Sequence, residues 1–263
     1  MLRDIWTKTL WDQRRALLGW AVGLLAVSLI YGGFYPFAAT PAYGDLIANL
    51  PEGLAEAMGW SDISSPHGYL GSTVFGILGP ILTIIFAIAT GARAIAGDEE
   101  SGSLELLITH PVTRTRVVVH RAIALILAVL GAGAIVFGAI LVISGPIELE
   151  LPMSHVAAAS LQLALLACVF GSLAMLVGGV VGRRGLVLGV SAIAAVLSYL
   201  ANGVAPMVDA LAWMQDISPF YWFAGTDTLR DGLDPANAAL LAGLSALFLL
   251  GSVIAFNRRD VAV

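Results

Sequence analysis

Six long apolar runs constrain the fold more than any other feature of this sequence. The runs occupy residues 19–37, 70–92, 122–143, 156–181, 186–208 and 236–256. Each is about as long as the stretch of roughly 20 apolar residues that a helix needs to cross a bilayer. Because 59% of all residues are hydrophobic and only 12% are charged, little of the chain remains for a soluble domain. The sequence predicts an all-α, multi-pass membrane protein, in which residues 1–263 form one domain of six transmembrane helices.

The basic residues fall almost entirely on alternate connections between these runs. Twelve of the 13 lie before the first run, between the second and third, between the fourth and fifth, or after the sixth. Arg230 lies on the opposite set of connections, which also holds most of the acidic residues. Since lysine and arginine mark cytoplasmic loops, both termini are predicted to be cytoplasmic. The first run is too long for the core of a signal peptide, so we expect it to remain as a span.

Two amphipathic segments are expected to lie at the membrane surfaces. Residues 1–18 mix leucines and tryptophans with four basic side chains, which predicts an interfacial helix along the inner leaflet or a simple juxtamembrane anchor. Residues 209–235 place aromatic side chains among acids, which is typical of an aromatic belt at the outer interface. An outer gate or a substrate exit is the alternative for that second segment.

The apolar runs contain few groups that could do chemistry. None has a charged residue or a histidine at its middle, although such groups usually mark ion-coupled transport. Gln162 and Asn202 are the most polar exceptions, and they either form hydrogen bonds between helices or line a substrate pathway. His67 has no histidine, cysteine or clustered carboxylate at ligand spacing, so no metal site is expected. Because the sequence has no Walker loop and no hydrolase or metalloprotease motif, we expect no enzyme and no cofactor in this chain.

The connection between the second and third runs, residues 93–121, holds four basic and four acidic residues. Ser103 can cap a short helix over residues 104–110, and Pro111 would end it. Thr113 can then cap a basic helix that leads into the third run. A two-turn amphipathic helix outside the bilayer buries little apolar area by itself. We therefore expect this helix to dock in a groove of a cytoplasmic partner, or else to lie on the inner leaflet.

The segment Glu100-Ser-Gly-Ser-Leu-Glu-Leu-Leu-Ile-Thr-His-Pro-Val-Thr-Arg114 resembles the signature that follows the second span of type-2 ATP-binding-cassette (ABC) permeases. The whole layout is similar, from the basic N-terminal helix to the basic C-terminus. The resemblance implies the type-2 ABC exporter fold, with residues 93–121 as a coupling segment that sits in a cleft of a separate ATP-binding subunit. Ser103 stands where threonine is frequent, which keeps the hydroxyl cap. The residues that the resemblance implies for ATPase coupling are Glu99, Glu100, Gly102, Leu104, Glu105, Leu107, Pro111 and Arg114.

This resemblance implies that the chain is the permease subunit of an ABC exporter in the inner or plasma membrane. It would move a hydrophobic or amphipathic substrate, such as a drug, a lipid or a peptide, outward as an efflux system. ATP and Mg would bind to the separate ATP-binding subunit, and a second permease copy, identical or related, would complete the complex within the lipid bilayer. No nucleic acid is expected to bind. An ion-coupled secondary carrier and a non-transporting membrane anchor for an ATPase are the alternatives.

Overall fold

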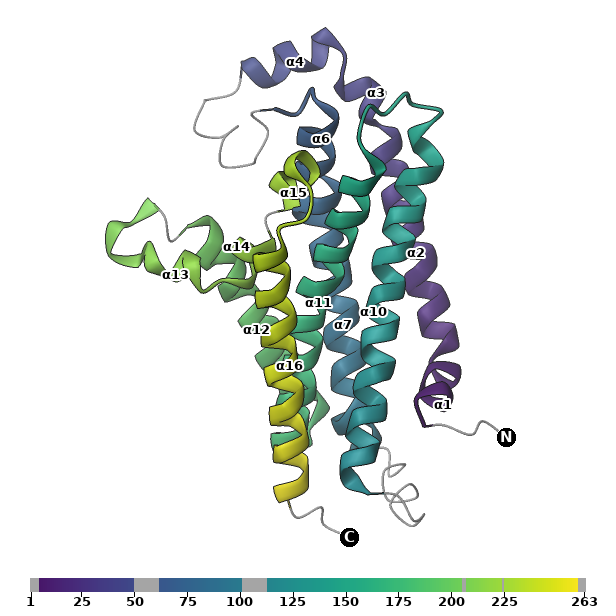
Figure 1. Cartoon of the computed structure of the whole chain (residues 1–263), viewed down its shortest axis with the longest axis vertical. Helices are drawn as coiled ribbons and strands as arrows, with labels where there is room; N and C mark the ends of the chain where they lie inside the picture. The colour runs from purple at the N-terminus through teal and green to yellow at the C-terminus, as the bar shows by residue number, and fades with distance from the viewer. Residues whose placement is uncertain (1–4, 50–61, 101–112, 205–206, 224, 260–263) are drawn as a thin grey trace.

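The structure is a computed structural model that describes residues 5–49, 62–100, 113–204, 207–223 and 225–259. The described residues form an elongated bundle of helices without β-strands (Figure 1). Six helices are long and apolar enough to cross a membrane, which confirms the predicted number of spans. The first helix and the last both reach the same end of the bundle, as an even number of crossings requires.

Each span consists of one long helix or of several helices in line. The spans are α2 with α3 (Arg14–Gly33 and Tyr35–Ala38), α6, η1, α7 and η2 (Pro66–Ser72, Val74–Leu78, Gly79–Ala92 and Arg93–Gly97), α10 (Arg114–Ser144), α11 (Met153–Val181), α12 (Arg184–Gly203) and α16 (Pro235–Arg258). The connections contain α1 (Ile5–Asp12), α4 (Pro41–Ala48), α8 (Asp98–Glu100), η4 (Asp209–Leu211), α13 (Trp213–Asp216), α14 (Pro219–Phe223) and α15 (Gly225–Asp231). The first span thus begins before residue 19, and α1 covers only part of the surface helix predicted for residues 1–18.

Glycine and proline give the second span its irregular course. Its segments η1 and η2 are π-helical turns, in which carbonyl groups bond to the amide five residues ahead rather than four. A Cβ atom on Gly79 would collide with the carbonyl oxygen of Val74, so the turn η1 requires glycine at this position. Pro80 follows and offers no amide hydrogen to the preceding turn. The helix α7 therefore starts inside the span, in a direction that η1 sets.

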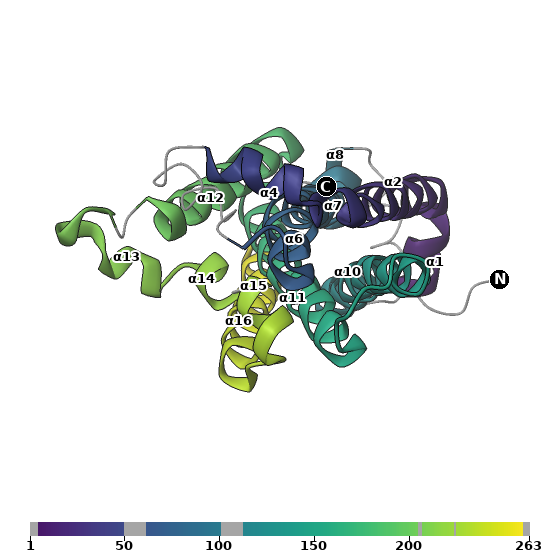
Figure 2. The same ribbon diagram turned by 90° about the horizontal axis from the view of Figure 1, so that it is seen from above.

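The helix α11 lies at the centre of the bundle, in contact with α7, α10, α12 and α16 (Figure 2). In its most apolar stretch 67% of the residues are buried, against 17% for α2 and for α12. Small residues permit the close packing, because a Cβ atom on Gly91 of α7 would collide with the carbonyl oxygen of Gly171 in α11. On another side of α11, Ser252 of α16 donates a hydrogen bond to the carbonyl oxygen of Met175 at 3.1 Å. We call α7, α10, α11 and α16 the packed centre; α2 and α12 lie on opposite flanks of it.

The connection between α12 and α16 folds partly back into the bundle. The helix α13 projects sideways (Figures 1 and 2), whereas α14 packs inward. The ring centroid of Phe220 in α14 lies 5.9 Å from that of Phe170 in α11 and 5.4 Å from that of Tyr199 in α12. Phe223 is buried as well, while Trp213 is exposed. Only some of the aromatic residues of this connection are therefore available for the aromatic belt that composition predicts.

Candidate functional site

Basic residues gather at the end of the bundle where α1 begins and α16 finishes, which we call the basic end (Figure 1). Among the residues that the structure describes, every lysine and arginine except Arg230 belongs to a segment that reaches this end. Five segments that are far apart in the sequence meet here: α8, the starts of α10 and α12, and the ends of α11 and α16. Hydrogen bonds and an ion pair join them.

Arg259, the residue that follows α16, joins three of the other segments. Its Nη2 atom forms an ion pair with Oε1 of Glu99 in α8, and its Nη1 atom donates a hydrogen bond to the carbonyl oxygen of Gly178 in α11 at 3.3 Å. Its own carbonyl oxygen accepts a hydrogen bond from Nη1 of Arg114 in α10 at 2.7 Å. Only 21% of the Arg259 side chain and 24% of the Glu99 side chain are exposed. The ion pair is therefore partly shielded from water, which strengthens the attraction between its charges.

Glu100 and Thr113 flank the stretch of the coupling segment that lies outside the described residues. Oε1 of Glu100 accepts a hydrogen bond from the backbone N–H of Arg184 at 2.9 Å, at the start of α12. A carboxylate is favourable there because the start of a helix carries a partial positive charge. The side chain of Thr113 accepts a hydrogen bond from the N–H of Arg116 at 3.3 Å and caps α10. The predicted cap is thus confirmed.

Two more contacts join α10 to its neighbours. Arg121 is buried, and its Nη1 atom donates a hydrogen bond to the carbonyl oxygen of Ala94 in η2. Nδ2 of Asn257 in α16 donates a hydrogen bond to Oγ1 of Thr115 in α10 at 2.8 Å. The helices that enter and leave the coupling segment are therefore fastened to each other and to α16.

The structure brings together the three predicted coupling residues that it describes. Glu99, Glu100 and Arg114 all contact other parts of this chain, two of them through Arg259. The remaining predicted positions lie outside the described residues, so their role in coupling stays a prediction: Gly102, Leu104, Glu105, Leu107 and Pro111, with Ser103 and the predicted helix 104–110. Sequence reasoning missed Arg259, because its charge was used only for topology. The acidic residues 98–100 are the signal that could have indicated a partner for it.

An apolar groove of 340 Å³ lies between the second span and α12. Ile81 and Ile85 of α7 line one wall, Val196 and Tyr199 of α12 line the other, and Phe220 of α14 also lines the groove. The Tyr199 hydroxyl is the one polar side-chain group in the lining. A hollow of this size and composition suits an apolar guest, with a single group that can form a hydrogen bond.

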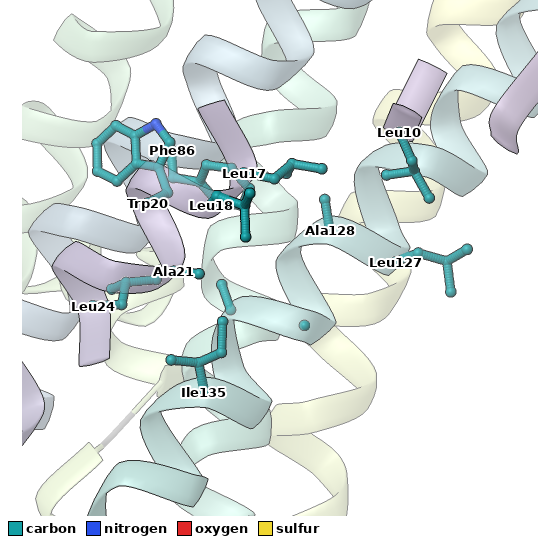
Figure 3. A pocket seen from close by; sticks show the side chains of 12 residues that line it. Leu10, Leu17, Leu18, Trp20, Ala21, Leu24, Phe86, Leu127, Ala128 and Ile135 are labelled. Atoms are coloured by element: carbon teal, nitrogen blue, oxygen red, sulfur yellow. The ribbon is translucent and has the colours of Figure 1, made fainter. Parts of the chain in front are cut away.

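A second apolar hollow, of 310 Å³, lies on the opposite flank between α2 and α10 (Figure 3). Leu17 and Leu24 of α2 line it together with Ile135 of α10. The ring of Trp20 lies 5.7 Å from that of Phe86 in α7, which closes the hollow towards the packed centre. One hollow thus lies along α2 and the other along α12. The apolar stretches of these two helices are the least buried of the six spans.

The two predicted pathway residues line neither hollow. Gln162 in α11 is completely buried, and neither its amide nitrogen nor its amide oxygen has a hydrogen-bond partner among the described residues. Asn202 in α12 is half-buried, and its backbone carbonyl oxygen accepts a hydrogen bond from Nε2 of Gln215 at 3.4 Å. That these two residues line a substrate pathway stays a prediction.

His67, at the end of the bundle opposite the basic end, has neighbours that sequence spacing did not indicate. Its Nε2 atom lies 2.8 Å from Oδ2 of Asp62 and 3.3 Å from Nη2 of Arg230 in α15. Arg230 also lies 3.6 Å from the same carboxylate oxygen. This cluster joins the connection after the first span to α15. No group of three or more histidine, cysteine, aspartate or glutamate residues that could hold a metal ion occurs in the described part of the chain.

Six helices that are long and apolar enough to cross a membrane define a multi-pass membrane protein, with a charged segment between the second and third of them and an apolar groove beside α7. The chain belongs to the ABC-2 family of transporter proteins, because the profile described as ABC-2 family transporter protein matches residues 4–261. It is a membrane permease component of an ABC transporter, associated with a separate ABC ATP-binding subunit, and it is not itself the ATPase. A comparison with curated proteins gives no match.

Proposed function

We propose that this permease exports a hydrophobic or amphipathic substrate and that its coupling segment, residues 93–121, receives the ATP-binding subunit. The observation that carries the proposal is the apolar groove between α7 and α12, with the Tyr199 hydroxyl as its one polar side-chain group. A drug, a lipid or an apolar peptide would bury its surface there. The basic end marks the cytoplasmic side on this proposal, because basic residues resist translocation. Transport then runs outward, from that side to the other.

The course of the second span supports a mechanical link between groove and coupling segment. The helix α7 lines the groove, and it leads directly into η2 and α8, the first part of the coupling segment. It also packs against α11 at Gly91, while Arg121 holds η2 to α10. When ATP closes the partner ATPase dimer, the coupling segment would carry these helices along as one body. The groove, which separates parts of α7 and α12, is where such a movement changes the structure most.

A second permease copy fits the proposal because α12 has little cover within one chain. Only 17% of its apolar stretch is buried, and Ile193, Val196 and Leu197 expose most of their surface. We propose that a second copy, identical or related, covers part of this surface. The groove beside α12 would then lie near the junction of the two copies, and lipid would cover the rest.

The alternatives differ from an exporter in features that can be examined. An ion-coupled carrier needs ionisable groups buried within its spans. Among the described residues, the one buried charged side chain, Arg121, lies near the basic end, which disfavours such a carrier. A non-transporting anchor would bind the ATP-binding subunit through the same segment and move no substrate.

Reconstitution of the complex in proteoliposomes tests the proposal, with a hydrophobic cationic dye and a fluorescent phospholipid as probes. We expect ATP-dependent outward movement of at least one probe. Leu107→Asp should release the ATP-binding subunit in a pull-down and abolish stimulated ATP hydrolysis, because docking would bury a charge in an apolar cleft. Leu107→Met is the matched control and should bind normally. If Leu107→Asp keeps both properties, the docking proposal is wrong. If the ATP-binding subunit binds and neither probe moves, the result favours a non-transporting anchor over an exporter.

A further inference from the structure

Arg259 fastens the end of the last span to two residues of the coupling segment, Glu99 and Arg114. Glu99 lies where the second span passes into this segment, and Arg114 lies where the segment passes into the third span. Covalently, the coupling segment is continuous with the second and third spans alone. Through Arg259 it is also joined to the sixth span, which this residue follows, and to the fourth span at Gly178.

The carboxylate of Glu99 depends on this guanidinium. Oε1 pairs with Arg259, while Oε2 is buried and has no hydrogen-bond partner among the described residues. Removing one partner of a shielded ion pair leaves the other charge with little compensation. Because fully exposed ion pairs contribute little, this pair holds α8 against α16 more strongly than an exposed pair would.

The end of α11 makes room for the guanidinium. Gly182 has a φ of 68°, in the left-handed region, and its N–H donates a hydrogen bond to the carbonyl oxygen of Gly178 at 3.0 Å. Glycine adopts this conformation without strain, which is why it often ends helices. A Cβ atom at this position would also collide with the guanidinium of Arg259. The same glycine thus ends the helix and leaves the space that the arginine fills.

We propose that Arg259 is a positioning residue for coupling, which makes the sixth span move with the coupling segment together with the second and third. This inference rests on the proposed function, because it requires that an ATP-binding subunit moves the segment. Without Arg259, the segment would still pull on α7 and α10, and on α11 through its backbone contact with α7, while α16 would follow less closely. ATP would then be hydrolysed with less substrate moved. Arg259 lines neither hollow, so it acts through the helices and not on the substrate.

Exchange of the two charges tests the proposal. Arg259→Glu and Glu99→Arg each place like charges together, and we expect each to lower the amount of dye transported per ATP hydrolysed about tenfold, a size typical of coupling between sites. The double variant restores opposite charges and should recover most of this ratio. Arg259→Lys keeps the charge and loses the planar fork, so an intermediate loss is expected. The control is Arg258→Ala, an exposed neighbour, which should leave the ratio unchanged.

Pull-down of the ATP-binding subunit and the melting temperature of the complex are measured for the same variants. A merely structural role would lower the melting temperature and leave the transport ratio of the surviving complexes unchanged, and this result would overturn the proposal. A double variant no better than its worse single variant would overturn it too. If the wild-type complex moves neither probe, the proposed function fails and the inference fails with it. An active wild type with unaffected Arg259 variants overturns the inference alone.

Discussion

The two sides of α7 differ in how they are packed. On one side α7 lies against α11 with no side chain between the backbones, at Gly91 and Gly171. On the other side Ile81 and Ile85 face the groove that α7 shares with α12. A backbone contact has no side chain that could adapt, whereas isoleucines along a groove can repack as it changes width. The difference indicates that α7 moves with α11 and that movement occurs between α7 and α12.

Gly91→Val would disrupt the close contact between α7 and α11 and should have the largest effect on stability. Its Cβ atom would collide with the Gly171 carbonyl oxygen and lie 3.1 Å from Cβ of Ala174, so α7 and α11 would have to separate. We expect the free energy of unfolding to fall by about 3 kcal/mol or more, seen as loss of a single peak in size-exclusion chromatography of a fluorescent fusion. Gly131→Val is the control, because nothing lies within 4 Å of a Cβ atom there. A stable, active Gly91→Val protein would show that the contact is not rigid.

Gly182→Ala tests whether Arg259 needs the space that Gly182 leaves at the end of α11. Alanine in the left-handed conformation costs about 2 kcal/mol, and its Cβ atom would push the guanidinium of Arg259 away. We expect a lower melting temperature together with less transport per ATP hydrolysed. Gly189→Ala in α12, where a Cβ atom meets nothing within 4 Å, should behave like the wild type. A normal transport ratio in Gly182→Ala would mean that the arginine does not need this space.

Ile85→Trp tests the side of α7 that faces the groove. The indole would occupy part of the 340 Å³ groove, and because Ile85 is already exposed, folding should change little. We expect the initial rate of dye export to fall about tenfold, equivalent to about 1.4 kcal/mol of lost binding free energy. Leu247 in α16 is also exposed but lines neither hollow, so Leu247→Trp should export the dye at the normal rate. Export at the wild-type rate by Ile85→Trp would place the substrate elsewhere.

Arg230→Ala should have the smallest effect. Its side chain is 56% exposed, and its partner Asp62 is 46% exposed, so water screens their attraction. We expect a loss of less than about 1 kcal/mol, and a smaller one still in high salt. The melting temperatures of Arg230→Ala and Arg259→Ala, each taken at low and at high salt, measure these losses of stability. If the two arginines contributed equally, shielding from water would not explain the importance of the basic end.

Local sequence was sufficient to predict the spans and one helix cap. The six spans follow from the lengths of the apolar runs, and the cap at Thr113 follows from a hydroxyl placed directly before a helix-forming stretch. Such features depend on neighbours within a few residues. For the same reason the membership in a permease family could be anticipated from a short signature and confirmed over residues 4–261.

Contacts between distant segments could not be predicted in this way. Arg259 and Glu99 are 160 residues apart, and the spacing of charges along the chain does not indicate which of them meet. Phe220 belongs to a stretch whose composition is typical of a surface belt, yet its ring packs against Phe170 in the centre. His67 gains Arg230 as a neighbour only when α15 folds beside the second span. Tertiary packing decides each of these.

Two distances within the same complex test most directly whether α7 moves with α11 and apart from α12. Spin labels at Ile81→Cys and Val196→Cys would span the groove, and labels at Ile81→Cys and Val180→Cys would span the packed centre, since all three positions are exposed. Cys168, the single cysteine, is replaced by alanine, and labelled chains are diluted with unlabelled ones. We predict that trapping with ATP and vanadate changes the first distance and leaves the second unchanged. A constant first distance, or an equal change in both, would contradict the mechanism.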